Sequence, residues 1–232
     1  FLDLLTLPDN RMVANQLLDY LCLPVIQQSL KLSVSDVEQI NEWVTAANIY
    51  WGFDAAHKSE LLGAEQDAVY TWLWGIERIF KGSMSAPEDL DESLAWLSLV
   101  DGHGWAVLGR LQYFLHTLQD IRVELTKPRT AIAWSEYFKV QILPLLFDEF
   151  SRNESSYLTL VKGISSVVQA ITAAQYNAPI SLSIMQEELN NKFSIPDALN
   201  QFNTGQVTFS SMVPMRSVPF KVICMLGLND GV

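Results

Sequence analysis

The sequence has few cysteines and no apolar run long enough to cross a membrane. Its two cysteines, Cys22 and Cys224, lie near opposite ends of the chain, and neither belongs to a CxxC pair. This spacing argues against a zinc site and predicts two buried free thiols in a reducing, cytoplasmic compartment. Charged or amide residues interrupt every apolar stretch well before the ~20 residues that a spanning helix needs. We therefore expect no membrane association.

The motifs of several enzyme classes are also absent. The sequence has no GxxxxGK[ST] phosphate loop, no HExxH metal motif and no GxSxG nucleophile elbow. His57, His103 and His116 are isolated from one another and from cysteine, so we expect ordinary surface or core roles for them. Residues 145–149 resemble the apolar strand and Asp-Glu pair that hold Mg²⁺ in ATPases, but their helical periodicity favours a plain helix. We predict no catalytic residue, bound cofactor or metal ligand in this chain.

Both ends of the chain suggest a piece of a longer protein. The first residue is Phe1 rather than Met, and no basic segment with a cleavage site follows it. The last residues, 227–232, form a turn directly after an apolar run, where a sheet would normally continue. We expect the function to belong to a longer parent protein.

Negative charge is concentrated in the first half of the chain. Residues 1–101 hold 5 Lys or Arg against 16 Asp or Glu, whereas residues 102–232 hold 10 against 10. The first half would repel a phosphate backbone, so any contact with DNA must be local or helped by a more basic partner. We expect the acidic half, including Asp36, Glu38 and Glu42, to dock against a basic surface of a partner.

Apolar residues recur at helical spacing from residue 10 to about residue 200. Asn10 is a candidate N-cap, and residues 35–38 and 183–186 have the sequence of capping boxes. The spacing predicts helices over 12–21, 37–44, 66–80, 105–125, 134–150 (kinked at Pro144) and 157–176, and a further helix after 183.

The pattern changes near Gly205. Residues 207–210 alternate with the period of a strand, and residues 222–226 form the continuous apolar run of a buried, parallel strand. The predicted fold is therefore mainly α, with a helical domain over 1–204 that leads into the edge of an α/β domain over 205–232.

Seven tryptophans are spread over the helical part of the chain. Aromatic side chains at helical positions among leucines are typical of a core or an interface. Trp51, Trp72 and Trp74 are the candidates for base-stacking platforms.

The C-terminal residues 207–231 resemble motif V of UvrD-type superfamily 1 helicases. A Val-Thr strand, a loop ending in Phe220, an apolar strand and a Gly-Leu-x-x-Gly turn follow the motif without a gap. The loop reads Arg216-Ser217-Val218-Pro219-Phe220, so the motif's lysine, glycine and glutamate are replaced. This departure suggests a helicase fold without the chemistry of the motor.

Residues 212–221 are closely similar to the degenerate motif V of the RecC family, the gamma subunits of bacterial exodeoxyribonuclease V. Residues 49–54 and 71–78 resemble the family's Trp-Gly-x-Asp and Thr-Trp-x-x-Gly-x-x-Arg segments. The residues that carry the resemblance are Trp51, Gly52, Asp54, Trp72, Gly75, Arg78, Met215, Pro219, Phe220, Gly227 and Asp230.

The resemblance implies a fold and a function. Residues 1–204 would be a helicase domain 2B-like helical domain, inserted in a RecA-like α/β domain of which residues 205–232 are the start. The parent would be a non-catalytic subunit that clamps a RecB-like helicase–nuclease and a RecD-like helicase, splits a duplex end, guides the unwound single strand and reads the Chi signal. The complex would be an ATP-dependent exodeoxyribonuclease acting in double-strand break repair by homologous recombination, with ATP and Mg bound by the partner subunits.

Arg216 and Lys221 are the best candidates for DNA contact, because they flank a proline-stiffened loop at the edge of the predicted sheet. Thr208, in the preceding Val-Thr strand, is a third candidate. Plain alternatives exist: Lys221 as a solvated residue at a strand start, Arg216 paired with a helix C-terminus and Asp230 as a turn residue. Two other functions stay open, a fragment of an active superfamily 1 helicase or AddB-like nuclease and a helical protein-interaction scaffold.

Overall fold

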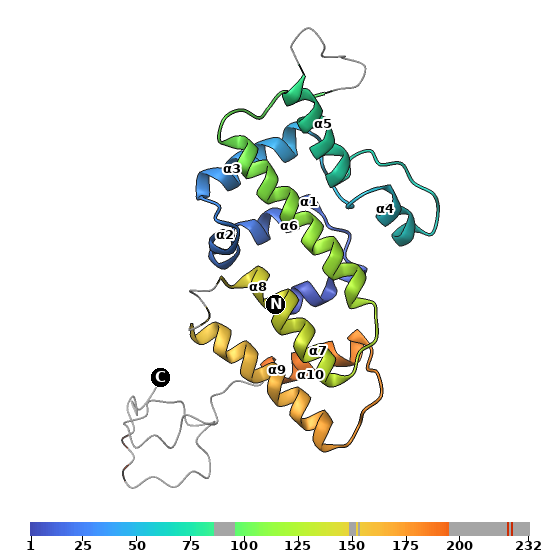
Figure 1. The fold of residues 1–232 in the computed structure, drawn as a ribbon, viewed down its shortest axis with the longest axis vertical. Coiled ribbons are helices and arrows are strands. Elements are labelled where there is room, and N and C mark those ends of the chain that lie inside the picture. Colours follow the sequence, from blue (N-terminus) through green and yellow to red (C-terminus); the bar gives the residue numbers. More distant parts are fainter. Residues whose placement is uncertain (86–95, 149–151, 153, 195–221, 223, 225–232) are drawn as a thin grey trace, which may run out of the picture. The chain divides into compact units, whose positions relative to one another are not determined.

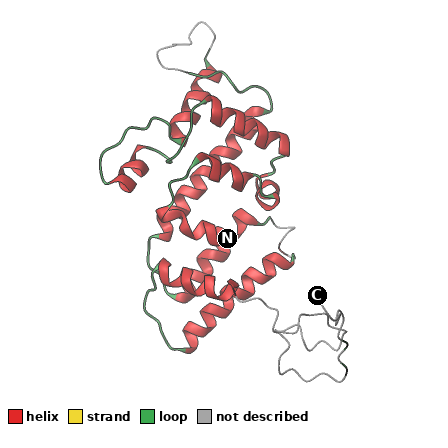
Figure 2. Cartoon of the chain, turned by 180° about the vertical axis from the view of Figure 1, so that it is seen from behind, coloured by secondary structure: helices red, strands yellow, loops and turns green. Residues whose placement is uncertain are grey.

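The computed structural model describes residues 1–85, 96–148, 152, 154–194, 222 and 224. The chain divides into two compact units, Phe1–Ser194 and Ile195–Val232. The first unit is helical (Figures 1 and 2). The predicted domain boundary at 204/205 and the strand at 207–210 lie outside the described residues, so the inserted-domain architecture stays a prediction.

The described residues form helices of very different lengths and no strand, which confirms the mainly α prediction. One isolated bridge joins Arg129 to Ile180. The elements are η1 (Leu2–Asp9), α1 (Ala14–Leu21), α2 (Pro24–Leu30), α3 (Val34–Ala46), α4 (Ala55–Leu62), α5 (Trp72–Met84), α6 (Gly104–Leu125), α7 (Ala131–Tyr137), η4 (Phe138–Ile142), α8 (Leu143–Leu146), α9 (Ser155–Ala173) and α10 (Leu182–Ser194).

The long helix α6 is central to the first unit. It lies against η1 and α3, while α1 packs on α2 and α3, and α10 packs on α9 and η1. Its predicted apolar stripe is buried as expected: Val107, Leu108, Leu111, Leu115, Leu118 and Ile121. One hydrophobic core runs through the unit, from Leu4 in η1 to Leu189 in α10.

Three tryptophans are fully or almost fully buried, and each indole N–H has a distant backbone partner. Trp43 Nε1 donates to Leu99 O (3.3 Å), Trp72 Nε1 to Met12 O (2.9 Å) and Trp134 Nε1 to Ile180 O (2.9 Å). A buried indole without such a partner would lose stability, so these bonds fix which segments meet.

Neither predicted capping box begins at the predicted serine. Ser33 is the N-cap of α3: its Oγ accepts from Asp36 N (3.2 Å), and Asp36 Oδ2 accepts from Ser33 N (2.8 Å). Ser35 Oγ instead contacts Ser33 Oγ at 2.9 Å. Helix α10 likewise starts at Leu182, before Ser183. In each case two serines lie two positions apart, and the earlier one precedes the helix.

Three other helix boundaries differ from the prediction. Asn10 does not cap α1, because its Oδ1 accepts from Met12 N (2.6 Å) and the helix starts at Ala14. Helix α5 starts at Trp72 rather than near residue 66, because Thr71 caps it. Helix α9 covers Ser155–Ala173 instead of 157–176.

The predicted helix 134–150 is interrupted. It begins at Ala131, passes through the π-helical turn η4 and resumes as α8, with Pro144 in its first turn. A π turn before a proline is a recognised way to accommodate a residue that cannot donate a backbone hydrogen bond. Leu145 and Leu146 lie in α8, so the helical interpretation of the Leu-Leu-Phe-Asp-Glu segment is confirmed for these two residues. It is wrong for Phe147, which is extended, and for Asp148, which also lies outside a helix.

The two cysteines are free but exposed, so the predicted burial of both is wrong. Of the predicted buried strand 222–226, the structure describes two residues, and Val222 and Cys224 are both exposed and outside a strand. Among the described helices, none is both long enough and apolar enough to cross a membrane.

Candidate interaction site

The two motif segments that the sequence singled out lie side by side. Trp72 N donates to Gly52 O (3.0 Å), Leu73 N to Phe53 O (2.9 Å) and Tyr50 N to Tyr70 O (2.9 Å). We call residues 49–54 together with 70–78 the motif corner. The corner contains the six N-terminal motif residues: Trp51, Gly52, Asp54, Trp72, Gly75 and Arg78.

Both glycines of the motif corner are required by geometry. Gly52 has φ +84°, and a Cβ there would lie 2.8 Å from Lys58 Cγ. Gly75 lies in α5, where a Cβ would overlap the side chain of Ile49. A side chain at either position would displace its neighbours, so these glycines explain the close approach of the two segments.

Trp72 is a structural residue. Its side chain is 0% exposed, and its indole N–H is used by Met12 O. The hypothesis that Trp72 stacks on a base is therefore wrong, because no ligand can reach the ring. Trp51 and Trp74 are only half-buried and remain accessible.

Arg78 joins α5 to the end of α3. Its guanidinium Nη1 donates to Ala47 O (3.0 Å), and its Cζ lies 4.3 Å from the centroid of the Trp74 ring. Burial lowers the pKa of Arg78, although an arginine remains charged at neutral pH. Arg78 is 9% exposed, so its guanidinium stabilises the position of the Trp74 indole through a cation–π contact and does not offer a charge to a ligand.

Asp54 and His57 order the loop that precedes α4. Asp54 Oδ1 accepts from His57 N (2.8 Å), which caps the helix, and Phe53 N donates to His57 Nδ1 (3.0 Å). Burial, together with the nearby Arg122 guanidinium, lowers the pKa of His57. His57 is therefore a neutral core residue, but only its Nδ1 is satisfied, because its buried Nε2 has no hydrogen-bond partner in the part of the chain that the structure describes.

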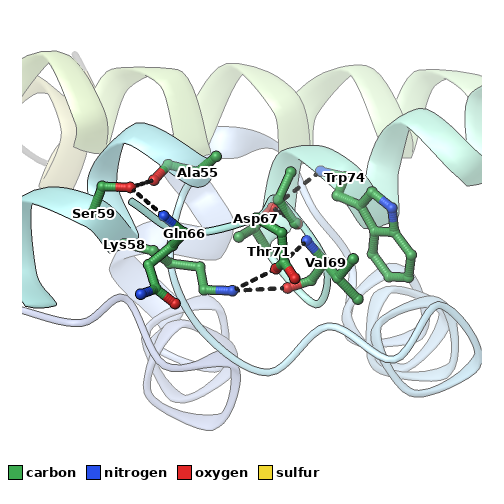
Figure 3. A network of polar contacts seen from close by, with 9 residues as sticks. Ala55, Lys58, Ser59, Gln66, Asp67, Val69, Thr71 and Trp74 are labelled. Atoms are coloured by element: carbon green, nitrogen blue, oxygen red, sulfur yellow. Dashed lines mark hydrogen bonds and ion pairs between the residues drawn. The ribbon is translucent and has the colours of Figure 1, made fainter. Parts of the chain in front are cut away.

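A polar network holds the loop between α4 and α5 (Figure 3). Lys58 Nζ donates to Asp67 Oδ1 (3.2 Å) and Val69 O (3.2 Å). Ser59 Oγ accepts from Gln66 N at 2.9 Å. Lys58 is almost buried, whereas Asp67 is largely exposed. The network shapes a loop that carries Tyr70 to the surface.

An exposed aromatic row forms part of the surface of the motif corner. Tyr50 is 56% exposed and Tyr70 is 47% exposed, and their ring centroids are 5.2 Å apart. Tyr70 and Trp74 follow at 5.8 Å, edge to face. Trp51 lies next to Tyr50 in the chain, with Lys58 Nζ 5.4 Å and Arg11 Cζ 5.9 Å from its ring. We call Tyr50, Tyr70 and Trp74 the aromatic row.

Sequence reasoning missed Tyr50 and Tyr70. Tyr50 lies inside the first motif segment and Tyr70 directly precedes the second, which is a signal that was present in the sequence. Their exposure depends on the positive φ of Tyr70 (68°) and on the pairing of the two segments, neither of which has a periodic pattern.

A groove of about 490 Å³ adjoins Tyr50, between α1 and α3. Its floor is apolar and consists of Ala14, Val44 and Ile49, all buried. The exposed amides of Asn15, Asn41 and Asn48 line its sides, and Arg11, Tyr50 and Trp51 line one end. We call this feature the α1/α3 groove.

The carboxylates with shifted pKa values have structural roles. The backbone N–H of Ser33 lowers the pKa of Asp36, and the Arg122 guanidinium lowers that of Glu60, with 2.8 Å between Arg122 Nη2 and Glu60 Oε2. Lys127 and Arg129 lower the pKa of Glu124. Asp36 is almost buried, so its predicted role in docking is wrong, because the carboxylate belongs to the cap of α3.

The remaining histidines and acidic groups contribute no further cluster. His103 is exposed, with Nε2 3.3 Å from Asp36 Oδ1, and the ring of His116 packs edge-on against Phe53 at 5.3 Å. In the part of the chain that the structure describes, no three His, Cys, Asp or Glu side chains gather as metal ligands would.

The C-terminal candidates for DNA contact cannot be placed. Thr208, Arg216 and Lys221 lie outside the described residues. The same holds for the rest of the second motif set: Met215, Pro219, Phe220, Gly227 and Asp230. Their roles stay predictions.

Comparison with known proteins gives one consistent result. The family profile "RecBCD enzyme subunit RecC fourth domain" matches residues 1–197. The RecBCD enzyme subunit RecC of Escherichia coli K12 is 28% identical over 233 residues, which are 100% of this chain and 21% of the relative. The RecC subunit of Mycobacterium tuberculosis H37Rv is 28% identical over 238 residues, covering 99% and 21%. That of Haemophilus influenzae Rd is 27% identical over 238 residues, covering 99% and 20%. The chain spans about a fifth of the length of these relatives.

Proposed function

Since the chain belongs to the RecC fourth-domain family, we propose that it is a non-catalytic DNA-handling and partner-binding module of an exodeoxyribonuclease V gamma subunit. The observation that carries the proposal is the family match over residues 1–197, together with relatives that are named as subunits of the RecBCD enzyme. The parent complex would act in double-strand break repair by homologous recombination.

The chemistry of the described residues supports a non-catalytic role. A catalytic acid or base needs a pKa suited to the working pH and a free position toward a substrate. Here Asp36 is used by a helix cap, Glu60 by Arg122, and His57 by the backbone of Phe53. In the proposed complex the helicase partners, RecB-like and RecD-like, bind ATP and Mg.

The proposed substrates are a duplex end and the single strand unwound from it. Splitting the duplex, guiding one strand and reading Chi are the roles of the parent. Arg216, Lys221 and Thr208 are the proposed DNA contacts of this segment, because the first half of the chain is too acidic to attract a phosphate backbone.

The test uses the full-length subunit assembled with its helicase partners. We expect the double variant Arg216→Ala/Lys221→Ala to bind forked DNA more weakly, with a salt slope shallower by roughly 2, because each phosphate contact contributes about 0.9. The matched control is Lys162→Ala/Lys192→Ala, which removes the same charge from α9 and α10. An unchanged slope in a normally assembled complex would refute the DNA contacts. A wild-type subunit that does not assemble with the partners would refute the proposed function itself.

A second function, a helical scaffold for protein interaction, is favoured by one observation. Helices α1 and α3 carry Asp19, Asp36, Glu38 and Glu42 and no lysine or arginine. A scaffold would bind its partner equally well with and without DNA. A pull-down that depends on DNA would contradict it.

A further inference from the structure

We propose that the α1/α3 groove binds a short polypeptide segment of a partner protein that carries a lysine or arginine next to its apolar residues. The proposal deepens the partner-binding part of the proposed function and rests on it. It assigns the bound segment to one groove and gives that segment a chemistry.

The groove has the composition of a peptide-binding surface. Its floor of Ala14, Val44 and Ile49 is apolar, so it can take aliphatic side chains out of water. Asn15 and Asn41 stand on opposite helices, and in the described part of the chain neither side-chain amide bonds to another residue. An asparagine amide both donates and accepts, which is what a peptide backbone lying between them requires.

One end of the groove is aromatic and carries a single cation. Tyr50 and Trp51 line this end with Arg11, and Ala14 N donates to Tyr50 O (2.8 Å), which ties the start of α1 to it. Among the described residues that line the groove, Arg11 is the one with an ionic side chain. Its guanidinium can donate hydrogen bonds to a carbonyl or a carboxylate of the bound segment.

The other direction along both helices is acidic. Asp19 lies one turn beyond Asn15 on α1, and Glu38 lies one turn before Asn41 on α3, so each is further from the aromatic end. Both carboxylates are exposed. A segment whose cationic residue extends past this end of the groove matches the carboxylates of Asp19 and Glu38, and such complementarity fixes orientation and excludes wrong partners.

The same charges argue against a nucleic acid in this groove. A phosphate backbone in the groove would be repelled by the carboxylates on α1 and α3, and those helices contain no cation to offset them. The aromatic row alone could stack on bases, but stacking proteins combine such rings with a positive groove. A polypeptide is therefore the occupant that the electrostatics favour.

The experiment replaces Asn41 with the photo-cross-linker p-benzoylphenylalanine in the full-length subunit, assembled with its helicase partners on forked DNA. The control cross-linker replaces Tyr113, an exposed residue of α6 that does not line the groove. We expect irradiation to join position 41 to a partner polypeptide, in a segment with lysine or arginine, and position 113 to give no such product.

A charge reversal tests the predicted orientation. Asp19→Lys/Glu38→Lys should reduce the position-41 product at least about tenfold, because like charges would then face the cation of the segment. The matched control Glu187→Lys/Glu188→Lys changes the net charge equally on the exposed face of α10 and should leave the product unchanged.

The other outcomes overturn the proposal in distinguishable ways. A cross-link from position 41 to DNA or to a second copy of the subunit would show that the groove holds that occupant and not a segment of a partner protein. An assembled complex that gives no cross-linked product at position 41 would overturn the groove as the binding site and leave the proposed function intact. A subunit that never assembles with its partners would overturn both the groove proposal and the proposed function.

Discussion

The motif corner and helix α6 are stabilised in different ways. In the corner, directional constraints act at single residues: a positive φ at Gly52, an indole hydrogen bond from Trp72 and a buried guanidinium at Arg78. In α6 the buried positions are mainly aliphatic, and apolar burial has no direction. Aliphatic residues of similar volume can replace one another, whereas the corner residues cannot be exchanged. A family is therefore easier to recognise from residues 49–78 than from the helices.

The largest difference between the two regions should come from Trp72. Trp72→Phe leaves the buried Met12 carbonyl without its donor and a void beside it, so we expect a loss of about 2–4 kcal/mol in the free energy of unfolding. The matched change in α6, Leu118→Met, should cost less than about 1.5 kcal/mol. Urea unfolding of the two variants measures both values. Equal losses would mean that the corner is no more demanding than the helix.

Replacing one glycine in each region with alanine should give smaller effects, and the two effects should have opposite signs. In Gly75→Ala the new Cβ overlaps buried Ile49, so we expect a net loss of about 1–2 kcal/mol. Gly109 lies in α6, and a Cβ there meets nothing within 4 Å. Gly109→Ala should therefore gain about 0.5–1 kcal/mol from helix propensity. Thermal unfolding of both variants reports the signs directly, and a stabilised Gly75→Ala would contradict the tight contact.

Much of the first unit could be predicted from the sequence, because helical periodicity is a local signal. The predicted start of α6 differs from the observed one by one residue. Helices α5 and α9 are both predicted, but their observed ends differ from the predicted ones. Helix starts were less certain where two serines compete, as at Ser33 and Ser35, since either side chain can accept from the backbone. The choice depends on Asp36, whose carboxylate reaches back to Ser33 N.

The candidate site was harder to predict. The motif residues Trp51 and Arg78 were chosen by resemblance, but their position relative to one another follows from the pairing of residues 50–53 with 70–73. The α1/α3 groove depends on how two helices pack, which a single sequence does not specify. Trp72 is an error of the opposite kind, a buried residue taken for a binding residue, because a tryptophan of the core and one of a binding surface look alike in a sequence.

The smallest expected effect is a pH dependence of stability that comes from His57, a residue of α4 that accepts from Phe53 N of the motif corner. Burial lowers the pKa of His57 from its ordinary value of 6.5, so the folded chain binds the proton less well than the unfolded chain. Stability from this group is complete above pH 6.5 and falls as the pH decreases through the unfolded value toward the lowered folded one. The pKa values of Asp36 and Glu60 are also lowered, but their contribution is lost only below about pH 4.5. The apolar packing of α6 has no such dependence.

We expect His57→Asn, whose Oδ1 can still accept from Phe53 N, to flatten the stability profile between about pH 6.5 and 4.5. A slope that persists in His57→Asn would assign the pH dependence to another group.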